Sequence, residues 1–143
     1  MKKEPVRIAL YLAVALVCAS CVFAPLKQAD LDACSTDRLI QILHQSYQDT
    51  LDVPTYRENK RMLRAEIVER RTDWVEPYRS AIVDGGLMIG MTTDQALIAQ
   101  GRPNWINAST SANGASEQWV YRRGSYSTMY AYFDDGVLTY LQW

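Results

Sequence analysis

The chain has 143 residues, 15 Lys and Arg against 16 Asp and Glu, and three cysteines. This length allows one domain with a sizeable core. Acidic residues slightly outnumber basic ones, whereas nucleic-acid binding requires an excess of basic residues on a surface. We therefore expect no nucleic-acid partner.

The first twenty residues are organised like a secretory signal peptide. Basic residues precede an unbroken apolar run from Ile8 to Val17, which is far shorter than the roughly 20 residues of a transmembrane helix. Two small residues, Ala19 and Ser20, then stand directly before Cys21. We therefore predict that residues 1–20 are removed by cleavage between Ser20 and Cys21.

The position of Cys21 resembles the lipobox of bacterial lipoproteins, in which this cysteine becomes the lipidated first residue. Cys18 stands where that family usually has Leu, and the bulky Val17 disfavours cleavage before Cys18. Val22, rather than Asp, follows Cys21. By resemblance to enterobacterial lipoproteins, this implies a periplasm-facing protein held in the outer membrane by acyl chains on Cys21. The alternative is an ordinary signal peptide with an incidental cysteine.

Helical patterns follow a short segment without periodicity. Residues 21–34 are predicted to form a tether, and Ser35 or Thr36 can cap the next helix. The apolar face of that helix comprises Leu39, Ile42, Leu43 and Tyr47. Its spacing is that of one side of an amphipathic helix.

A second, charge-rich helix is expected to begin at Pro54, which suits a first turn. Glu66 and Arg70 are spaced for an i,i+4 ion pair within it. Its apolar side comprises Tyr56, Leu63, Ile67 and Trp74.

A third short helix is expected from a capping box formed by Asp73 and Glu76. Its apolar stripe comprises Trp74, Tyr78 and Ile82. The pair Gly85-Gly86 is predicted to end it.

The most informative segment begins at residue 89. Thr92 and Gln95 form a capping box that starts a helix running to about residue 100. We expect Gly101 to take the left-handed conformation that ends this helix, and Pro103 forbids its continuation. Residues 104–116 are rich in small polar side chains and are predicted to form an exposed loop.

Three antiparallel strands are expected to complete the chain. Their predicted ranges are 117–123, 126–133 and 137–143, with Gly124-Ser125 and Asp135-Gly136 as turns. A two-residue turn at Asp135-Gly136 fixes the strand register. It places Phe133 opposite Leu138, Ala131 opposite Tyr140 and Met129 opposite Gln142 on one face. On the other face, Tyr132 meets Thr139, Tyr130 meets Leu141 and Thr128 meets Trp143.

One face of this sheet must pack on helices, and the other still carries aromatic side chains. Tyr130, Tyr132 and Trp143 are therefore the predicted partner-binding residues. The alternative is that the long helical segment covers both faces.

Several motifs together resemble the SmpA/OmlA family of small outer-membrane lipoproteins, whose best-known member, BamE, is an accessory subunit of the β-barrel assembly machinery. The matching residues are Ile89-Gly90-Met91-Thr92, Gln95, Gly101, Pro103, Trp119-Val120-Tyr121 and the hairpin from Tyr132-Phe133 to Gly136-Val137-Leu138. The resemblance implies an α+β fold in which helices pack on a three-stranded antiparallel sheet. It covers residues 83–143, and residues 35–82 form a helical extension that the family pattern lacks.

Catalytic machinery is not evident. The single histidine, His44, lies within the first amphipathic helix, and no cluster has zinc-ligand spacing. Asp134-Asp135 beside Gly136 are ordinary turn residues. Gly85-Gly86 and Gly90 do not form a phosphate loop.

We therefore predict a non-enzymatic, lipid-anchored envelope protein without a cofactor or metal. It would bind or scaffold a protein partner, with a role in outer-membrane assembly or integrity. The alternative is a periplasmic enzyme inhibitor, because β-lactamase-inhibitor proteins share a related helix-plus-sheet half. After processing, Cys34 remains as a thiol, either as a small buried side chain or as an intermolecular partner.

Overall fold

The computed structural model describes residues 25–46, 54–112, 114–123 and 127–143. Ser20 and Cys21 lie outside these ranges, as do Tyr47 and the predicted turn Gly124-Ser125. The chain divides into two compact units, Met1–Arg70 and Arg71–Trp143. The division falls after Arg70 rather than at the expected boundary between 82 and 83, so the third helix groups with the sheet.

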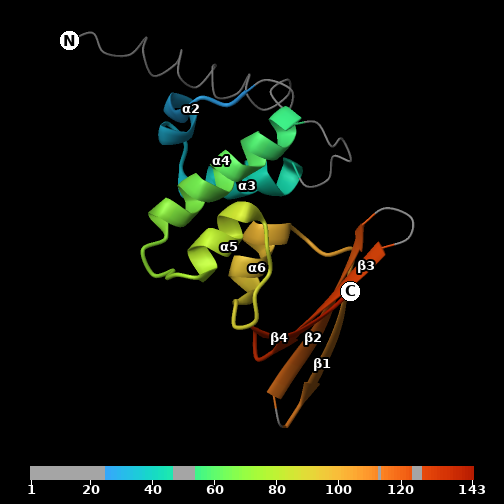
Figure 1. The fold of residues 1–143 in the computed structure, drawn as a ribbon. Coiled ribbons are helices and arrows are strands. Elements are labelled where there is room, and N and C mark those ends of the chain that lie inside the picture. The colour runs from blue at the N-terminus through green and yellow to red at the C-terminus, as the bar shows by residue number, and fades with distance from the viewer. Residues whose placement is uncertain (1–24, 47–53, 113, 124–126) are drawn as a thin grey trace, which may run out of the picture. The chain divides into compact units, whose positions relative to one another are not determined.

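The first unit contains helices α2 (Gln28–Asp32), α3 (Thr36–Ser46) and α4 (Pro54–Arg70), which are labelled in Figure 1. Helix α3 begins where the sequence predicts, because the Arg38 N–H donates to the Ser35 hydroxyl at 3.3 Å. Its Leu39 and Leu43 are fully buried. Burial of these two side chains confirms the predicted apolar face at their positions, and Ile42 is half-buried.

Helix α2 lies inside the segment that we expected to be an irregular tether, so that prediction is wrong. A long-range contact supports this short helix. The Arg70 guanidinium donates to the carbonyls of Leu31 at 3.0 Å and Cys34 at 2.6 Å. Arg70 also forms the predicted ion pair with Glu66 at 2.7 Å. Arg70 thus satisfies carbonyl groups at the end of α2, which no local pattern reveals.

Helix α4 starts at Pro54 as predicted, and Tyr56, Leu63 and Ile67 are buried along it. The expectation that Trp74 continues this apolar side is wrong, because α4 ends at Arg70.

The second unit begins with helix α5 (Tyr78–Asp84). The predicted capping box at Asp73 does not form a helix start. Instead, the Glu76 carboxylate accepts from the Ser80 N–H at 3.2 Å and from the Ser80 hydroxyl at 2.8 Å. Gly85 ends the helix in the left-handed conformation, with φ 76°.

Helix α6 (Thr93–Gln100) has the predicted capping box. The Gln95 N–H donates to the Thr92 hydroxyl at 3.3 Å, and the Gln95 side chain accepts from the Thr92 N–H at 2.9 Å. Gly101 ends the helix with φ 79° and ψ −169°. Its φ is positive as expected, but its ψ is extended, so the predicted left-handed helical conformation is wrong.

The sheet has four antiparallel strands rather than three, in the order β1 (Trp105–Ser111), β2 (Gly114–Arg123), β3 (Ser127–Asp134) and β4 (Val137–Gln142). The α+β class is confirmed, and the exposed loop predicted at 104–116 is wrong. All residues of β1 are exposed, so this strand lacks the alternation of apolar and polar residues by which a half-buried strand is recognised. Backbone pairing with β2 forms it instead.

The register between β3 and β4 is as predicted only next to the turn. Phe133 lies opposite Leu138, but an irregularity between Tyr132 and Phe133 then shifts the pairing. Beyond it, Tyr132 lies opposite Tyr140, Ala131 opposite Leu141 and Tyr130 opposite Gln142. Thr139 is the extra residue of this β-bulge, which the assumption of a regular ladder missed.

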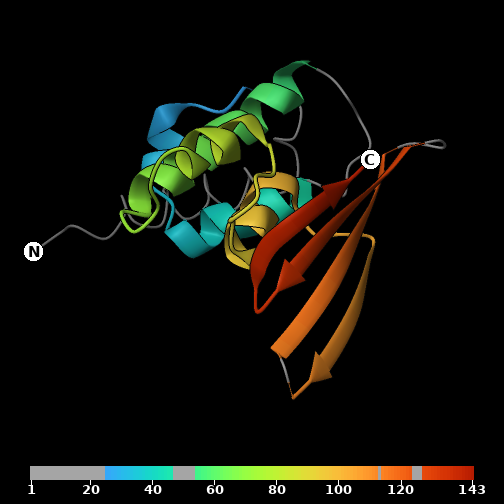
Figure 2. The ribbon, with the colours of Figure 1, turned by 60° about the horizontal axis from the view of Figure 1, so that its bottom comes forward.

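The core of the second unit lies on one face of the sheet, on which α5 and α6 gather (Figure 2). Its buried strand residues are Trp119, Tyr121, Met129, Ala131, Phe133 and Leu138. The rings of Trp119 and Phe133 have centroids 4.4 Å apart. The Tyr121 hydroxyl donates to the Gly101 carbonyl at 3.1 Å, which ties β2 to the end of α6.

Candidate interaction surface on the sheet

The face of the sheet opposite this core, here called the outer face, carries two cross-strand rows of side chains. Residues that pair across antiparallel strands share a face. The first row comprises Trp105, Val120, Tyr130 and Gln142, and the second comprises Asn107, Gln118, Tyr132 and Tyr140. The outer face therefore draws on all four strands.

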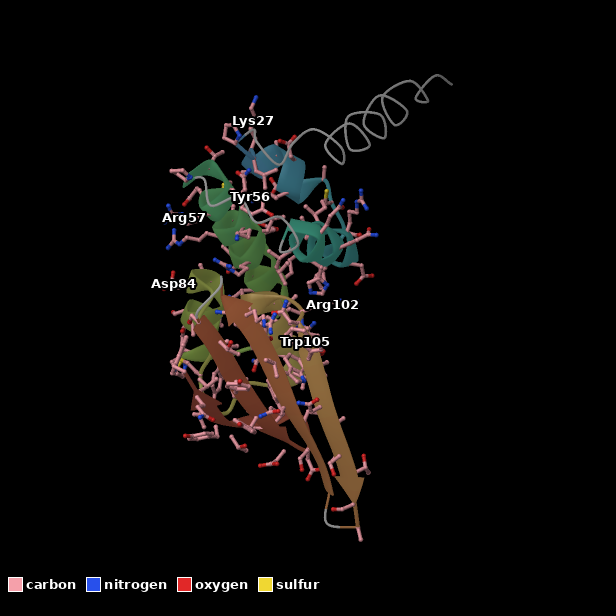
Figure 3. All side chains as sticks on the ribbon, turned by 90° about the vertical axis from the view of Figure 1, so that its right-hand side faces the viewer. Lys27, Tyr56, Arg57, Asp84, Arg102 and Trp105 are labelled. Atoms are coloured by element: carbon pink, nitrogen blue, oxygen red, sulfur yellow. The ribbon has the colours of Figure 1, made fainter. Side chains whose placement is uncertain are left out.

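A tryptophan and an arginine mark one side of this surface. Trp105 lies at the start of β1, where Figure 3 labels it, and it is 49% exposed. The guanidinium carbon of Arg122 lies 4.7 Å from the centroid of its ring. This is cation–π geometry, which favours a fixed orientation for both side chains.

A chain of hydrogen bonds runs along the second row and ends at Gln142 in the first row. The Asn107 side-chain amide donates to the Gln118 side-chain oxygen at 2.8 Å, and the Gln118 side-chain amide donates to the Tyr132 hydroxyl at 2.8 Å. The Tyr132 hydroxyl in turn donates to the Gln142 side chain at 3.3 Å. These bonds hold polar tips of the surface in fixed positions.

Two of the three predicted partner-binding residues lie together on this surface. Tyr130 and Tyr132 are half-buried on β3. Trp143 follows the last residue of β4 and is 75% exposed. The predicted pairing of Thr128 with Trp143 is wrong, because the bulge moves Gln142 opposite Tyr130. Trp143 lies beyond the end of β4 and belongs to neither cross-strand row.

Sequence reasoning missed Trp105, Arg122 and Tyr140 as members of the surface. A regular register predicts that Tyr140 faces inward, but it is 58% exposed on the outer face. The small polar residues of 104–116 predict a loop around Trp105. The signal that could have identified its strand is Asn113-Gly114, a residue pair that favours tight hairpins.

The remaining residues considered in the sequence, His44, Cys34 and Asp135, do not belong to the rows of the outer face. His44 is half-buried on α3, and the Cys34 side chain is half-exposed. Asp135 takes φ 48° in the β3–β4 turn, and its carboxylate accepts from the Ala115 N–H at 2.9 Å. Asp135 therefore joins this turn to the start of β2. Among the described residues, no group of three or more His, Cys, Asp or Glu side chains could hold a metal ion.

Within the described ranges, no helix has both the length and the apolar character needed to cross a membrane. The comparisons with protein-family models, curated proteins and solved structures found no match to this chain.

Proposed function

We propose that this chain is a lipid-anchored cell-envelope protein that binds a protein partner through the outer face of its sheet. The observation that carries this proposal is the composition of that face, which combines Trp105, Arg122, Tyr130, Tyr132 and Tyr140. Tryptophan, tyrosine and arginine are the residue types that dominate binding energy at protein interfaces.

The fixed geometry of these side chains supports the same proposal. Association loses affinity when flexible side chains must become ordered at the interface. The Tyr132 ring lies beside Tyr140, with centroids 5.6 Å apart, and its hydroxyl is held by Gln118 and Gln142. A surface that is ordered before binding avoids part of that entropic cost.

The envelope location rests on the resemblance of the N-terminal segment to a lipobox, with Cys21 as the acylated residue. The SmpA/OmlA-like motifs support a role in outer-membrane assembly or integrity. A binding role requires no catalytic group, and the outer face offers contact area with a few polar anchors, as interfaces do.

Site-specific photo-crosslinking in intact cells tests this proposal. A photoreactive amino acid at Tyr140, on the outer face, should crosslink to one envelope protein. The matched control places the same group at Asp94, which is exposed on the first turn of α6, and should not capture that protein. Capture at Asp94 but not at Tyr140, or capture at neither, would overturn the proposed surface.

A further inference from the structure

The free edge of the sheet has an unusual composition. β1 is the edge strand, and within the described residues its paired neighbour is β2 alone. Its sequence, Trp-Ile-Asn-Ala-Ser-Thr-Ser, contains no charged residue, no proline and no glycine. Proteins usually protect exposed strand edges with charges, prolines, bulges or covering segments, because a bare edge readily pairs with another strand.

The opposite edge of the same sheet is treated differently. The segment before α6 lies against β4, where the Gly90 N–H donates to the Leu138 carbonyl at 2.7 Å and the Leu138 N–H donates to the Met91 carbonyl at 2.8 Å. The Thr93 N–H also donates to the Gly136 carbonyl at 3.0 Å. The fold thus covers the start of β4 and leaves β1 exposed along its length.

The side chains of β1 are complementary to those of a second, antiparallel copy. With the two-fold axis at Ala108, Trp105 would lie opposite Ser111, Ile106 opposite Thr110, and Asn107 opposite Ser109. Each large side chain would then meet a small one. No like charges would meet across the interface, because the strand carries none. Like charges directly opposite each other would oppose such pairing.

From this complementarity we propose that β1 pairs with β1 of a second copy of this chain. The product is a two-fold symmetric dimer with one continuous eight-stranded sheet. An isologous contact of this kind uses the same patch on both copies. Residues that face each other across the axis share a face, so the two outer faces lie on the same side of the joined sheet. This inference concerns self-association and does not depend on the proposed partner.

Disulfide trapping tests the register directly in the purified full-length chain. All variants carry Cys34→Ser and otherwise share the same native cysteines. Ala108→Cys places the thiols of the two copies next to each other across the axis. The Cα atoms of directly opposed residues lie about 4.5–5.5 Å apart, within the range that a disulfide can bridge. Ser111→Cys is the control, because its two copies would be about 20 Å apart along the strand direction.

Under mild oxidation, Ala108→Cys should convert to a covalent dimer beyond the level of the Cys34→Ser parent, and Ser111→Cys should not. A second arm mixes Asn107→Cys with Ser109→Cys, which should form mixed dimers in preference to dimers of either variant alone. Dimers at Ser111→Cys as abundant as at Ala108→Cys, or no gain over the parent in both arms, would overturn the proposal. Photo-crosslinking at Tyr140 can succeed or fail independently of these outcomes.

Discussion

Tyr132 and Tyr140 lie directly opposite each other on β3 and β4, with ring centroids 5.6 Å apart. They meet because the β-bulge at Thr139 shifts the register by one residue. The Thr139 hydroxyl lies 3.2 Å from the Tyr132 carbonyl and 3.0 Å from the Asp134 carboxylate, which supports the bulge. In a regular ladder Tyr140 would point inward beside Ala131. One extra residue therefore adds an aromatic ring to the outer face.

Replacing Tyr132 and Phe133 separately should distinguish the two faces of the sheet. Phe133→Ala should lower the free energy of unfolding by about 3–5 kcal/mol, because the ring is fully buried. Tyr132→Ala should cost less, because its ring is half-buried and its removal leaves no closed cavity. Loss of the aromatic pair with Tyr140 accounts for about 0.5–1.5 kcal/mol of that cost. Urea denaturation measures both values. Tyr132→Ala should also weaken crosslinking at Tyr140. Equal destabilisation by the two substitutions would show that the faces are assigned wrongly.

Gly90 should be sensitive to the addition of a single methyl group. Its φ is +94°, and a Cβ at this position would clash with the Tyr78 hydroxyl. Gly90→Ala should therefore lower the free energy of unfolding by about 1–3 kcal/mol through backbone strain, with an added cost from overpacking.

Gly86→Ala is the control for this substitution. The nearest atom to a Cβ at Gly86 is the Ala81 carbonyl oxygen at 3.6 Å, which is an ordinary contact. In the Gly90→Ala background, Tyr78→Phe should restore part of the lost stability because it removes the clashing oxygen. Thermal unfolding compares the wild type, the two single alanine variants and the Gly90→Ala, Tyr78→Phe double variant. Equal stability of Gly90→Ala and Gly86→Ala would refute this account.

The hydroxyl of Thr92 should contribute to stability as a helix cap. Thr92→Ala removes the acceptor for the Gln95 N–H and should cost about 1 kcal/mol, within a range of roughly 0.5–2. Thr93→Ala should cost much less, because the contact of Thr93 with Gly136 uses its backbone N–H. Chemical denaturation compares the two. If Thr93→Ala lost more stability than Thr92→Ala, the assignment of Thr92 as the helix cap would be wrong.

The elements predicted well from the sequence are those defined by local chemistry. Thr92 and Gln95 satisfy each other's backbone within one turn, Pro54 fits the start of a helix, and Asp135-Gly136 closes a tight hairpin. Each signal depends on residues that are neighbours in the chain. Local patterns therefore gave α4, α6 and the β3–β4 turn correctly.

The errors arose where distant backbone or side chains determine structure. Helix α2 is supported by Arg70, and β1 exists through pairing with β2 rather than through burial. The same limit applies to the candidate surface. Strand alternation is enough to place Tyr130 and Tyr132 on the outer face. Placing Trp105 there depends on knowing that β1 is a strand, and placing Tyr140 there depends on knowing the position of the β-bulge. Neither has a periodic hydrophobic signal.

Lipidation at Cys21 is the prediction on which the proposed envelope location depends. Acyl chains contribute about 0.8 kcal/mol per buried methylene, and stable anchoring requires more than one such signal. Cys21→Ser should therefore abolish fatty-acid labelling and leave the product unprocessed or released from the membrane. Cys18→Ser is the matched control, because it changes the neighbouring cysteine and should leave labelling intact. Metabolic labelling with an alkyne fatty acid, followed by membrane fractionation, compares the two. Full labelling of Cys21→Ser would reject the lipobox, and loss of labelling only in Cys18→Ser would move the modified residue to Cys18.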